Sequence, residues 1–236
     1  MRLRLFPLNA VLFPGAALNL HIFEPRYKQM MKECLAAGEP FGVCLVREGD
    51  EVGDPDAIPC DVGTTAEIVE TTPIEGGRRL VSAIGRARFR IVEIVSRDPF
   101  IVADVEAVPD DEPMEASVLE GLISEIRAVF REYLRLLVEV SGREFDIDLP
   151  RSPVEASFLI GDALQVADSM KQRLLELSST QQRLTVELGF LRRMLPQLRA
   201  LLDKNRRAAP SRMEAPAGGA SRAEQERFFG KHFSLN

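Results

Sequence analysis

The start of the chain decides the fold: it reads Leu5-Phe6-Pro7-Leu8-Asn9 and, after a Pro14-Gly15 turn, Phe23-Glu24-Pro25-Arg26-Tyr27. Leucines alternate with arginines over residues 2–5, which is typical of a half-buried strand. Residues 18–23 alternate in the same way and predict a second strand. Pro25 suits the first position of a helix, and apolar residues recur at helical spacing behind it. We therefore expect strand, turn, strand and helix in this order.

The chain from residue 41 to 108 alternates with a period of two and predicts five further strands. They are Phe41–Val46, Thr65–Thr72, Arg79–Ile84, Ala87–Val95 and Phe100–Val108. Glycines in 75–78 predict a tight hairpin between two of these strands. An acidic segment with a proline at each end, 109–113, then marks a boundary, so we assign residues 1–112 to a β domain.

Beyond this boundary the apolar period changes to that of a helix, which predicts a helical domain over residues 113–204. Ser152-Pro153-Val154-Glu155 fits a capping box at the start of one helix. Leucines from 184 to 202 recur at alternating spacings of four and three, a seam that packs on neighbouring helices. Pro196 lies inside this run, where we expect a kink or a free carbonyl.

The last part of the sequence changes composition twice. Residues 205–222 are rich in Ala, Pro, Gly, Ser and Arg, and this composition predicts a disordered linker. Residues 223–236 then carry Phe228, Phe229, Phe233 and Leu235. Exposed aromatic side chains lower solubility unless they dock, so this tail motif is expected to bind the same chain or another protein. A tail without any role is the third alternative.

The charge of the chain is −6 overall and is concentrated at the start. Residues 1–112 carry 12 basic and 19 acidic groups, a net charge of −7. This gives no electrostatic footprint for a phosphate backbone, and we expect no nucleic-acid partner. Three cysteines without metal-ligand spacing, and the absence of a signal sequence or a membrane-length apolar run, predict a cytoplasmic protein with reduced thiols and no membrane contact.

Motifs that carry enzyme chemistry are absent from the sequence. It contains no phosphate-binding loop of the Walker type and no Gly-x-Ser-x-Gly elbow. The two histidines, His21 and His232, lie at opposite ends of the chain. We expect a non-catalytic protein with no cofactor and no metal.

Arg86, Arg88 and Arg90 form the clearest charge pattern, because a period of two places them on one face of a strand. This face could bind an acidic peptide or an anion. Alternatively it is a solvated sheet face with partners such as Glu67 or Glu93.

Several motifs resemble the amino-terminal domain of ATP-dependent Lon proteases. They are Leu5–Asn9, Val11–Gly15, Ile22–Tyr27, Pro40–Arg47, Gly85–Arg90 and Gln172–Leu177. The resemblance covers residues 1 to about 203 and implies an α+β fold: a PUA-like β pseudo-barrel followed by an α-helical bundle. In full-length Lon this region helps to recognise unfolded or tagged substrates and supports assembly. The sequence lacks the Walker motifs and the Ser-Lys dyad of that enzyme.

The resemblance implies a protein- or peptide-binding module whose partners are unfolded polypeptides or a folded protein. Candidate binding residues are Phe13, Phe23, Arg26 and Tyr27, where the barrel meets the helices. As alternatives, the chain acts as an adaptor or regulator of a Lon-type protease, associates with itself through its helices, or binds a small molecule or RNA as other PUA-like barrels do.

Overall fold

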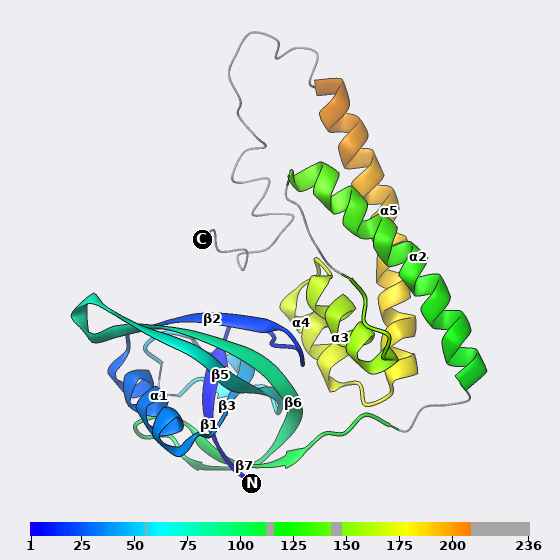
Figure 1. Cartoon of the computed structure of the whole chain (residues 1–236). Coiled ribbons are helices and arrows are strands. Elements are labelled where there is room, and N and C mark those ends of the chain that lie inside the picture. The colour runs from blue at the N-terminus through cyan, green and yellow to red at the C-terminus, as the bar shows by residue number, and fades with distance from the viewer. Residues whose placement is uncertain (55, 112–115, 143–147, 209–236) are drawn as a thin grey trace. The chain divides into compact units, whose positions relative to one another are not determined.

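The structure is a computed structural model that describes residues 1–54, 56–111, 116–142 and 148–208 (Figure 1). The chain divides into two compact units. The barrel unit comprises Met1–Asp111 and Asp168–Ser178, and the helical unit comprises Glu112–Ala167 and Ser179–Asn236. The fold is α+β with a mostly antiparallel sheet, as the sequence predicts.

The barrel unit is built on seven strands, one helix between the second and third strands, and a short final helix. The strands are β1 (Arg2–Leu8), β2 (Ala17–Ile22), β3 (Phe41–Glu48), β4 (Ile58–Pro59), β5 (Val62–Ile74), β6 (Arg78–Ser96) and β7 (Val102–Ala107). The helices are α1 (Pro25–Ala37) and α4 (Asp168–Glu176), and a 3-10 turn, η1 (Glu75–Gly77), joins β5 to β6.

A ring of strands closes the barrel. The sheet runs β1-β7-β6-β5-β3, and parallel pairing of β1 with β3 joins its two ends. All other pairs in the ring are antiparallel. β2 lies outside the ring, and among the described strands it pairs with the first part of β6 and no other. β2, β6 and β5 thereby form a three-stranded extension of the barrel (Figure 1).

β6 is one strand of 19 residues, where the sequence predicts two. The predicted break lies at Gly85, but the strand continues because this glycine admits a close backbone neighbour. A Cβ atom there would lie 2.3 Å from the Phe13 carbonyl oxygen. The Gly85 amide donates to Ala16 and its carbonyl accepts from Gly15, so the Pro14-Gly15 turn is bonded directly to β6.

Two apolar clusters fill the barrel unit. One joins α1 to the strands and includes Tyr27, Met30, Met31 and Phe41. The other includes Leu5, Cys44, Phe89 and Ala103. Gly38 ends α1 in the left-handed conformation, as predicted, with φ 64°.

α4 lies about sixty residues beyond β7 in sequence and belongs to the barrel unit. The Gln172 side chain donates to the Val62 carbonyl at 3.0 Å. The sequence-based assignment of residues 113–204 to one helical domain does not separate this helix from its neighbours, because all the predicted helices share the same apolar period.

The helical unit contains α2 (Ala116–Ser141), α3 (Pro153–Ala163) and α5 (Thr180–Ala208). Ser152 caps α3 by accepting from the Glu155 amide at 3.4 Å, as the sequence predicts. α5 continues through Pro196 without a break and extends four residues beyond the predicted end at 204. Pro196 is exposed, so water can reach the carbonyl that its missing amide leaves free.

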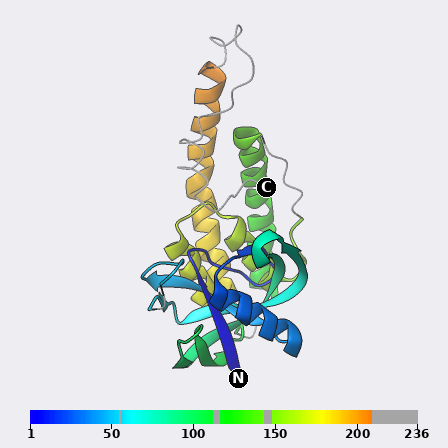
Figure 2. The same ribbon diagram turned by 90° about the vertical axis from the view of Figure 1, so that its left-hand side faces the viewer.

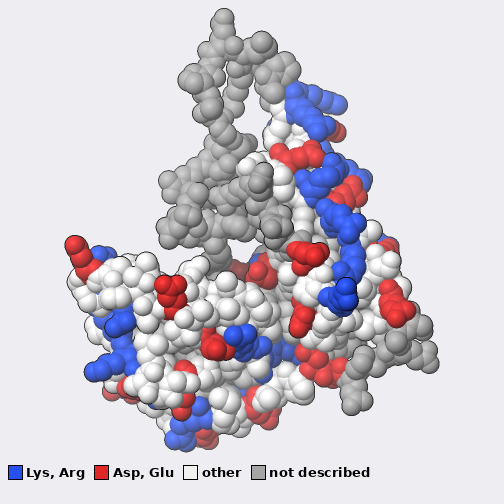
Figure 3. Space-filling model, viewed as in Figure 1, with Lys and Arg blue, Asp and Glu red and all other residues white. Residues whose placement is uncertain are grey.

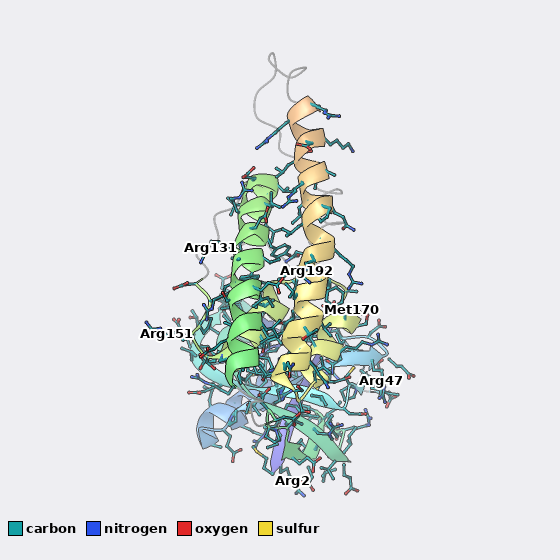
Figure 4. All side chains as sticks on the ribbon, turned by 90° about the vertical axis from the view of Figure 1, so that its right-hand side faces the viewer. Arg2, Arg47, Arg131, Arg151, Met170 and Arg192 are labelled. Atoms are coloured by element: carbon teal, nitrogen blue, oxygen red, sulfur yellow. The ribbon has the colours of Figure 1, made fainter. Side chains whose placement is uncertain are left out.

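α2 and α5 lie side by side and run parallel, as both ribbon views show (Figures 1 and 2). Three ion pairs join them, and the paired residues recur every seven positions on each helix. The pairs are Glu125 with Arg192, Glu132 with Arg199, and Glu139 with Arg206. Figure 3 shows the resulting alternation of charge along the pair, and Figure 4 shows Arg192 on the side of α5 turned toward α2, with Arg131 on the side of α2 away from α5.

A buried charged cluster lies at the start of α5. Arg183 is fully buried, stacks 4.1 Å above the Phe158 ring and donates to Ser157 at 2.8 Å. Glu187, one turn later, is also fully buried, and neither carboxylate oxygen has a hydrogen-bond partner within the described residues. Burial raises the pKa of the Glu187 carboxyl well above its usual range, and the charge of Arg183 only partly opposes this.

We predict that Glu187→Met stabilises the chain at pH 8 by about 1–3 kcal/mol, because the folded chain must keep this buried carboxyl protonated at a pH at which it ionises when unfolded, and a packed apolar side chain avoids that cost. The contribution of this carboxyl to the free energy of unfolding should fall as pH rises above about 4.5. In that window the unfolded chain loses the proton of this carboxyl while the folded chain keeps it. Thermal unfolding at pH 4.5 and pH 8 measures the difference.

The control is Glu120→Met, because Glu120 is exposed on α2. Its effect should be small at both pH values. A stabilisation by Glu187→Met that is equal at pH 4.5 and pH 8 would contradict the raised pKa.

Candidate functional site

The residues around the start of α1 form the region in which the sequence predicts a binding site. Arg26 donates to the Glu24 carboxylate at 2.9 Å and to the Asp54 carbonyl at 3.1 Å. Its guanidinium also lies 4.5 Å above the centre of the Tyr27 ring. Arg26 therefore joins the loop at Asp54 to the start of the helix. One of its terminal nitrogens is buried without a partner in the described part of the chain.

Two of the predicted site residues belong to the core. Phe13 is fully buried, and Tyr27 is 5% exposed and stacks on Phe6 with 4.1 Å between ring centres. Burial raises the pKa of Tyr27 to about 12, so its hydroxyl stays protonated at neutral pH. Neither side chain is available to a macromolecular partner.

Phe23 is the predicted site residue that the structure places at the surface, with 45% of its side chain area exposed. It follows β2 directly and lies 5.8 Å from the His21 ring. His21 pairs with Leu80 of β6. The Leu80 residue is also 45% exposed to solvent. Two residues along each strand, Asn19 pairs with Ser82, and their side chains are hydrogen-bonded at 2.9 Å.

These residues define what we call the outer face of the β2–β6–β5 extension: Asn19, His21, Phe23, Leu80 and Ser82. Two large apolar side chains stand here beside polar ones, and on β5 the register places Thr72 next to Leu80 and Glu70 next to Ser82. Much of the barrel unit is uncharged in the view of Figure 3. Sequence reasoning found Phe23 but missed Leu80, because alternation along a strand does not tell which of its two faces is buried.

The three arginines of β6 differ in exposure. Arg86 is exposed and paired with Glu67 at 2.6 Å, and Arg90 is exposed and lies 3.9 Å from Glu106. Arg88 is buried, which corrects the prediction of a three-arginine strip. The register with β5 is continuous from Arg88 to Arg90, so these two arginines point to the same side of β6. Arg88 is buried there because the end of α4 and the segment after β7 lie against it.

Arg88 holds the end of α4 and the segment that follows β7. Its guanidinium donates to the carbonyls of Leu175 at 2.8 Å, Leu177 at 2.6 Å and Pro109 at 3.1 Å. It also forms an ion pair with Asp110 at 3.2 Å. These acceptors indicate a structural role for Arg88.

We predict that Arg88→Met destabilises the barrel unit by about 3–5 kcal/mol, because it leaves buried carbonyls and the Asp110 carboxylate without their donor. Arg86→Met and Arg90→Met are matched controls on the same strand and should each cost less than about 1 kcal/mol, since exposed ion pairs contribute little. Urea unfolding of the three variants compares them directly. Equal losses at all three positions would contradict the structural role of Arg88.

A depression of about 420 Å³ on the barrel unit is lined by Arg2, Leu3, Arg4, Gln29, Glu33, Glu39, Pro99, Phe100 and Val102. Its central cation, Arg4, already bonds to Glu33 at 3.1 Å and to Glu39 at 2.7 Å. The charges in this depression therefore neutralise one another and offer little to a charged ligand.

The described cysteine thiols are not activated. Burial raises the thiol pKa of Cys34, to about 11, and of Cys44 and Cys60, so little thiolate forms at neutral pH. Over the same part of the chain, no cluster of His, Cys, Asp and Glu has the geometry to hold a metal ion. Among the described helices, none has the length and apolarity needed to cross a membrane. The tail residues Phe228, Phe229, Phe233 and Leu235 lie outside the described residues.

Comparison with known proteins identifies the family. The model of the ATP-dependent protease La (LON) substrate-binding domain matches residues 2–193. The chain belongs to this family. The match is to the substrate-binding domain and not to an ATPase or protease domain.

Curated relatives are Lon proteases of bacteria. That of Porphyromonas gingivalis is 28% identical over 180 residues, 74% of this chain and 21% of the relative. That of Anaeromyxobacter dehalogenans is 26% identical over 186 residues, 78% of this chain and 22% of the relative. The chain thus spans about a fifth of the length of these relatives.

Solved structures agree with this assignment. A Lon N-terminal domain protein from Xanthomonas campestris has a TM-score of 0.61 and 25% identity, with 80% of this chain and 98% of that chain covered. The N-terminal domain of the Mycobacterium avium complex Lon protease has a TM-score of 0.59 over 81% of this chain and 98% of that chain. At 18% identity, this second likeness concerns the fold alone.

Proposed function

We propose that the chain is a non-catalytic module that binds unfolded polypeptides through the outer face of the β2–β6–β5 extension. The observation that carries this proposal is the exposure of Phe23 and Leu80 on that face, in a family described as a substrate-binding domain. Exposed apolar side chains with polar neighbours are typical of interaction surfaces.

The energetics suit weak, general binding. Full burial of a Phe or Leu side chain contributes about 1.5–3 kcal/mol, so covering the exposed part of each contributes about 1 kcal/mol. Two such contacts discriminate apolar segments from polar ones without requiring one sequence. The charge of −7 over residues 1–112 favours neutral or basic segments over acidic ones.

Reversible binding of this kind would suit a cytoplasmic protein that samples non-native chains. Three free cysteines, two of them buried, support a reducing compartment.

A second candidate is an adaptor or regulator of a Lon-type protease. It is favoured by the extent of the family match, which includes α2, α3 and about half of α5 in addition to the barrel. Saturable binding of a purified Lon-type protease at a fixed ratio, with no binding of unfolded polypeptide, would favour the adaptor over the substrate-binding module.

We predict that the double substitution Phe23→Ser, Leu80→Ser lowers the affinity for an unfolded polypeptide about tenfold to thirtyfold, because two apolar contacts of about 1 kcal/mol each are lost. Fluorescence anisotropy with labelled, reduced and carboxymethylated α-lactalbumin measures the change. Stability should fall little, since both side chains are half exposed.

The matched control is Val92→Ser, Val95→Ser, because these β6 side chains are 64% and 46% exposed but lie on the part of the strand that pairs with β7. The control should keep the native affinity. An equal loss in both double variants would mean that binding follows general surface apolarity and not the outer face.

A further inference from the structure

The β2–β6–β5 extension ends on each side in a strand edge, and the two edges differ. On one side, residues 67–74 of β5 pair with β6 and with no other described strand, because β3 reaches β5 only at Thr64–Ala66. On the other side, β2 pairs with β6 alone within the described part of the chain. An open strand edge offers unpaired amides and carbonyls to another extended chain.

The β5 edge carries features that prevent such pairing. It has two carboxylates, Glu67 and Glu70, a proline, Pro73, and a bulge between Ile68 and Glu70. Charge, proline and bulges are the devices by which natural sheets avoid edge-to-edge association. This edge is therefore unsuited to an added strand.

The β2 edge has none of these devices. Its sequence, Ala-Leu-Asn-Leu-His-Ile, contains no Asp, Glu, Lys, Arg or Pro, and its register with β6 is continuous over all six residues. The two edges of one three-stranded sheet thus differ in their capacity to accept a strand, and β2 is the one that can pair.

The free backbone groups of β2 recur at alternate residues. The Gly85 amide donates to the Ala16 carbonyl, which sets the hydrogen-bonded pairs of this ladder at the even-numbered residues of β2. The amides and carbonyls of Ala17, Asn19 and His21 therefore point away from β6. No hydrogen bond among the described residues joins these groups to another strand or helix.

The residues with free backbone groups also carry the exposed side chains of β2. Asn19 and His21 belong to the outer face, and the exposed Ala17 shares their side of the strand, whereas Leu20 points the other way and is buried. In an antiparallel ladder, two residues that exchange hydrogen bonds have their side chains on the same face of the sheet. A segment that pairs with β2 in this way therefore places its bonded residues beside the rings of His21 and Phe23, which lie 5.8 Å apart.

Charge decides between the two kinds of strand that an open edge accepts, a second copy of β2 and an unfolded polypeptide. Residues 1–112 carry 12 basic and 19 acidic groups, a net charge of −7, so two barrel units brought edge to edge repel each other. A neutral or basic segment meets no such repulsion. The observations therefore favour an extended segment of another polypeptide that carries no acidic side chains.

We propose that an unfolded polypeptide binds to the β2 edge as an added antiparallel strand, with apolar side chains at alternate positions on the outer face. This inference rests on the proposed function and adds the bound conformation and the class of segment selected. The backbones of Ala17, Asn19 and His21 supply hydrogen bonds that do not depend on the sequence of the segment. Phe23 and the His21 ring favour an apolar residue at every second position.

N-methylated peptides test the backbone contacts with the native chain. The probe is the labelled peptide Lys-Thr-Val-Thr-Phe-Thr-Val-Thr-Lys with blocked ends, and fluorescence anisotropy measures its affinity. N-methylation of both valines and the phenylalanine should lower the affinity at least about thirtyfold, because these residues bond to β2. N-methylation of the three threonines is the matched control and should keep the affinity within about threefold, since their amides point away from β2. Equal effects of the two sets, or the reverse order, would overturn the proposal.

Hydrogen exchange of single amides, read by NMR, locates the added strand. The amides of Ala17, Asn19 and His21 should exchange at least about tenfold more slowly when the unmethylated peptide saturates the chain. The amides of Leu18 and Leu20 bond to β6 and should keep the same protection with and without peptide. Unchanged exchange at Ala17, Asn19 and His21 would overturn the proposal. Protection of these amides in the free chain that grows with protein concentration would assign the edge to a second copy and overturn it as well.

Failure of this inference can be distinguished from failure of the proposed function. Binding that Phe23→Ser, Leu80→Ser weakens, but that both N-methylated peptides retain, would keep the outer face as the binding surface and exclude strand addition. Binding that the double substitution leaves unchanged would contradict the proposed function itself.

Discussion

The buried guanidinium of Arg88 joins parts of the barrel unit that lie far apart in sequence. It reaches from the middle of β6 to the carbonyls that end α4 and to the segment after β7. A helix end leaves carbonyls without intrahelical donors, and a cation is the most effective group to satisfy them. Next to this contact, the amide of Asp111 donates to Ser178, and the Ser178 hydroxyl donates back to the Asp111 carboxylate. Two of the points where the chain leaves the barrel unit are therefore bonded to each other.

In the helical unit the constraint is that α2 and α5 run parallel and side by side. Parallel helices cannot be joined by a short turn, so the chain between α2 and α5 must travel back along their length before α5 begins. It forms α3 on the way, which packs on α5. Arg127 of α2 donates to the carbonyls of Leu149 and Pro150 and so fixes the chain just before α3. The seven-residue repeat of ion pairs sets the register of α2 against α5, although each exposed pair contributes little to stability.

Local chemistry made much of this fold predictable from sequence. The turn at Gly15, the α1 end at Gly38 and the Ser152 cap each depend on a few adjacent residues, and the structure has all three. The predictions that failed depend on pairing between distant segments. Arg88 is buried because α4 and the segment after β7 lie against it, and the membership of α4 in the barrel unit follows from bonds to residues more than eighty positions away. Neither can be inferred from the period of the sequence alone.

The same reasoning explains why the candidate site was only partly predicted. Phe13, Phe23 and Tyr27 are equally apolar in the sequence, and only the fold separates the two core residues from the exposed one. Pairing of β1 with β3 closes the barrel, and the aromatic side chains that point inward are then buried in its core. β2 lies outside this ring, and so its outer side chains and its free edge are not required for closure. Phe23 follows a strand that closure of the barrel does not require, and so its side chain can stay exposed without loss of the ring.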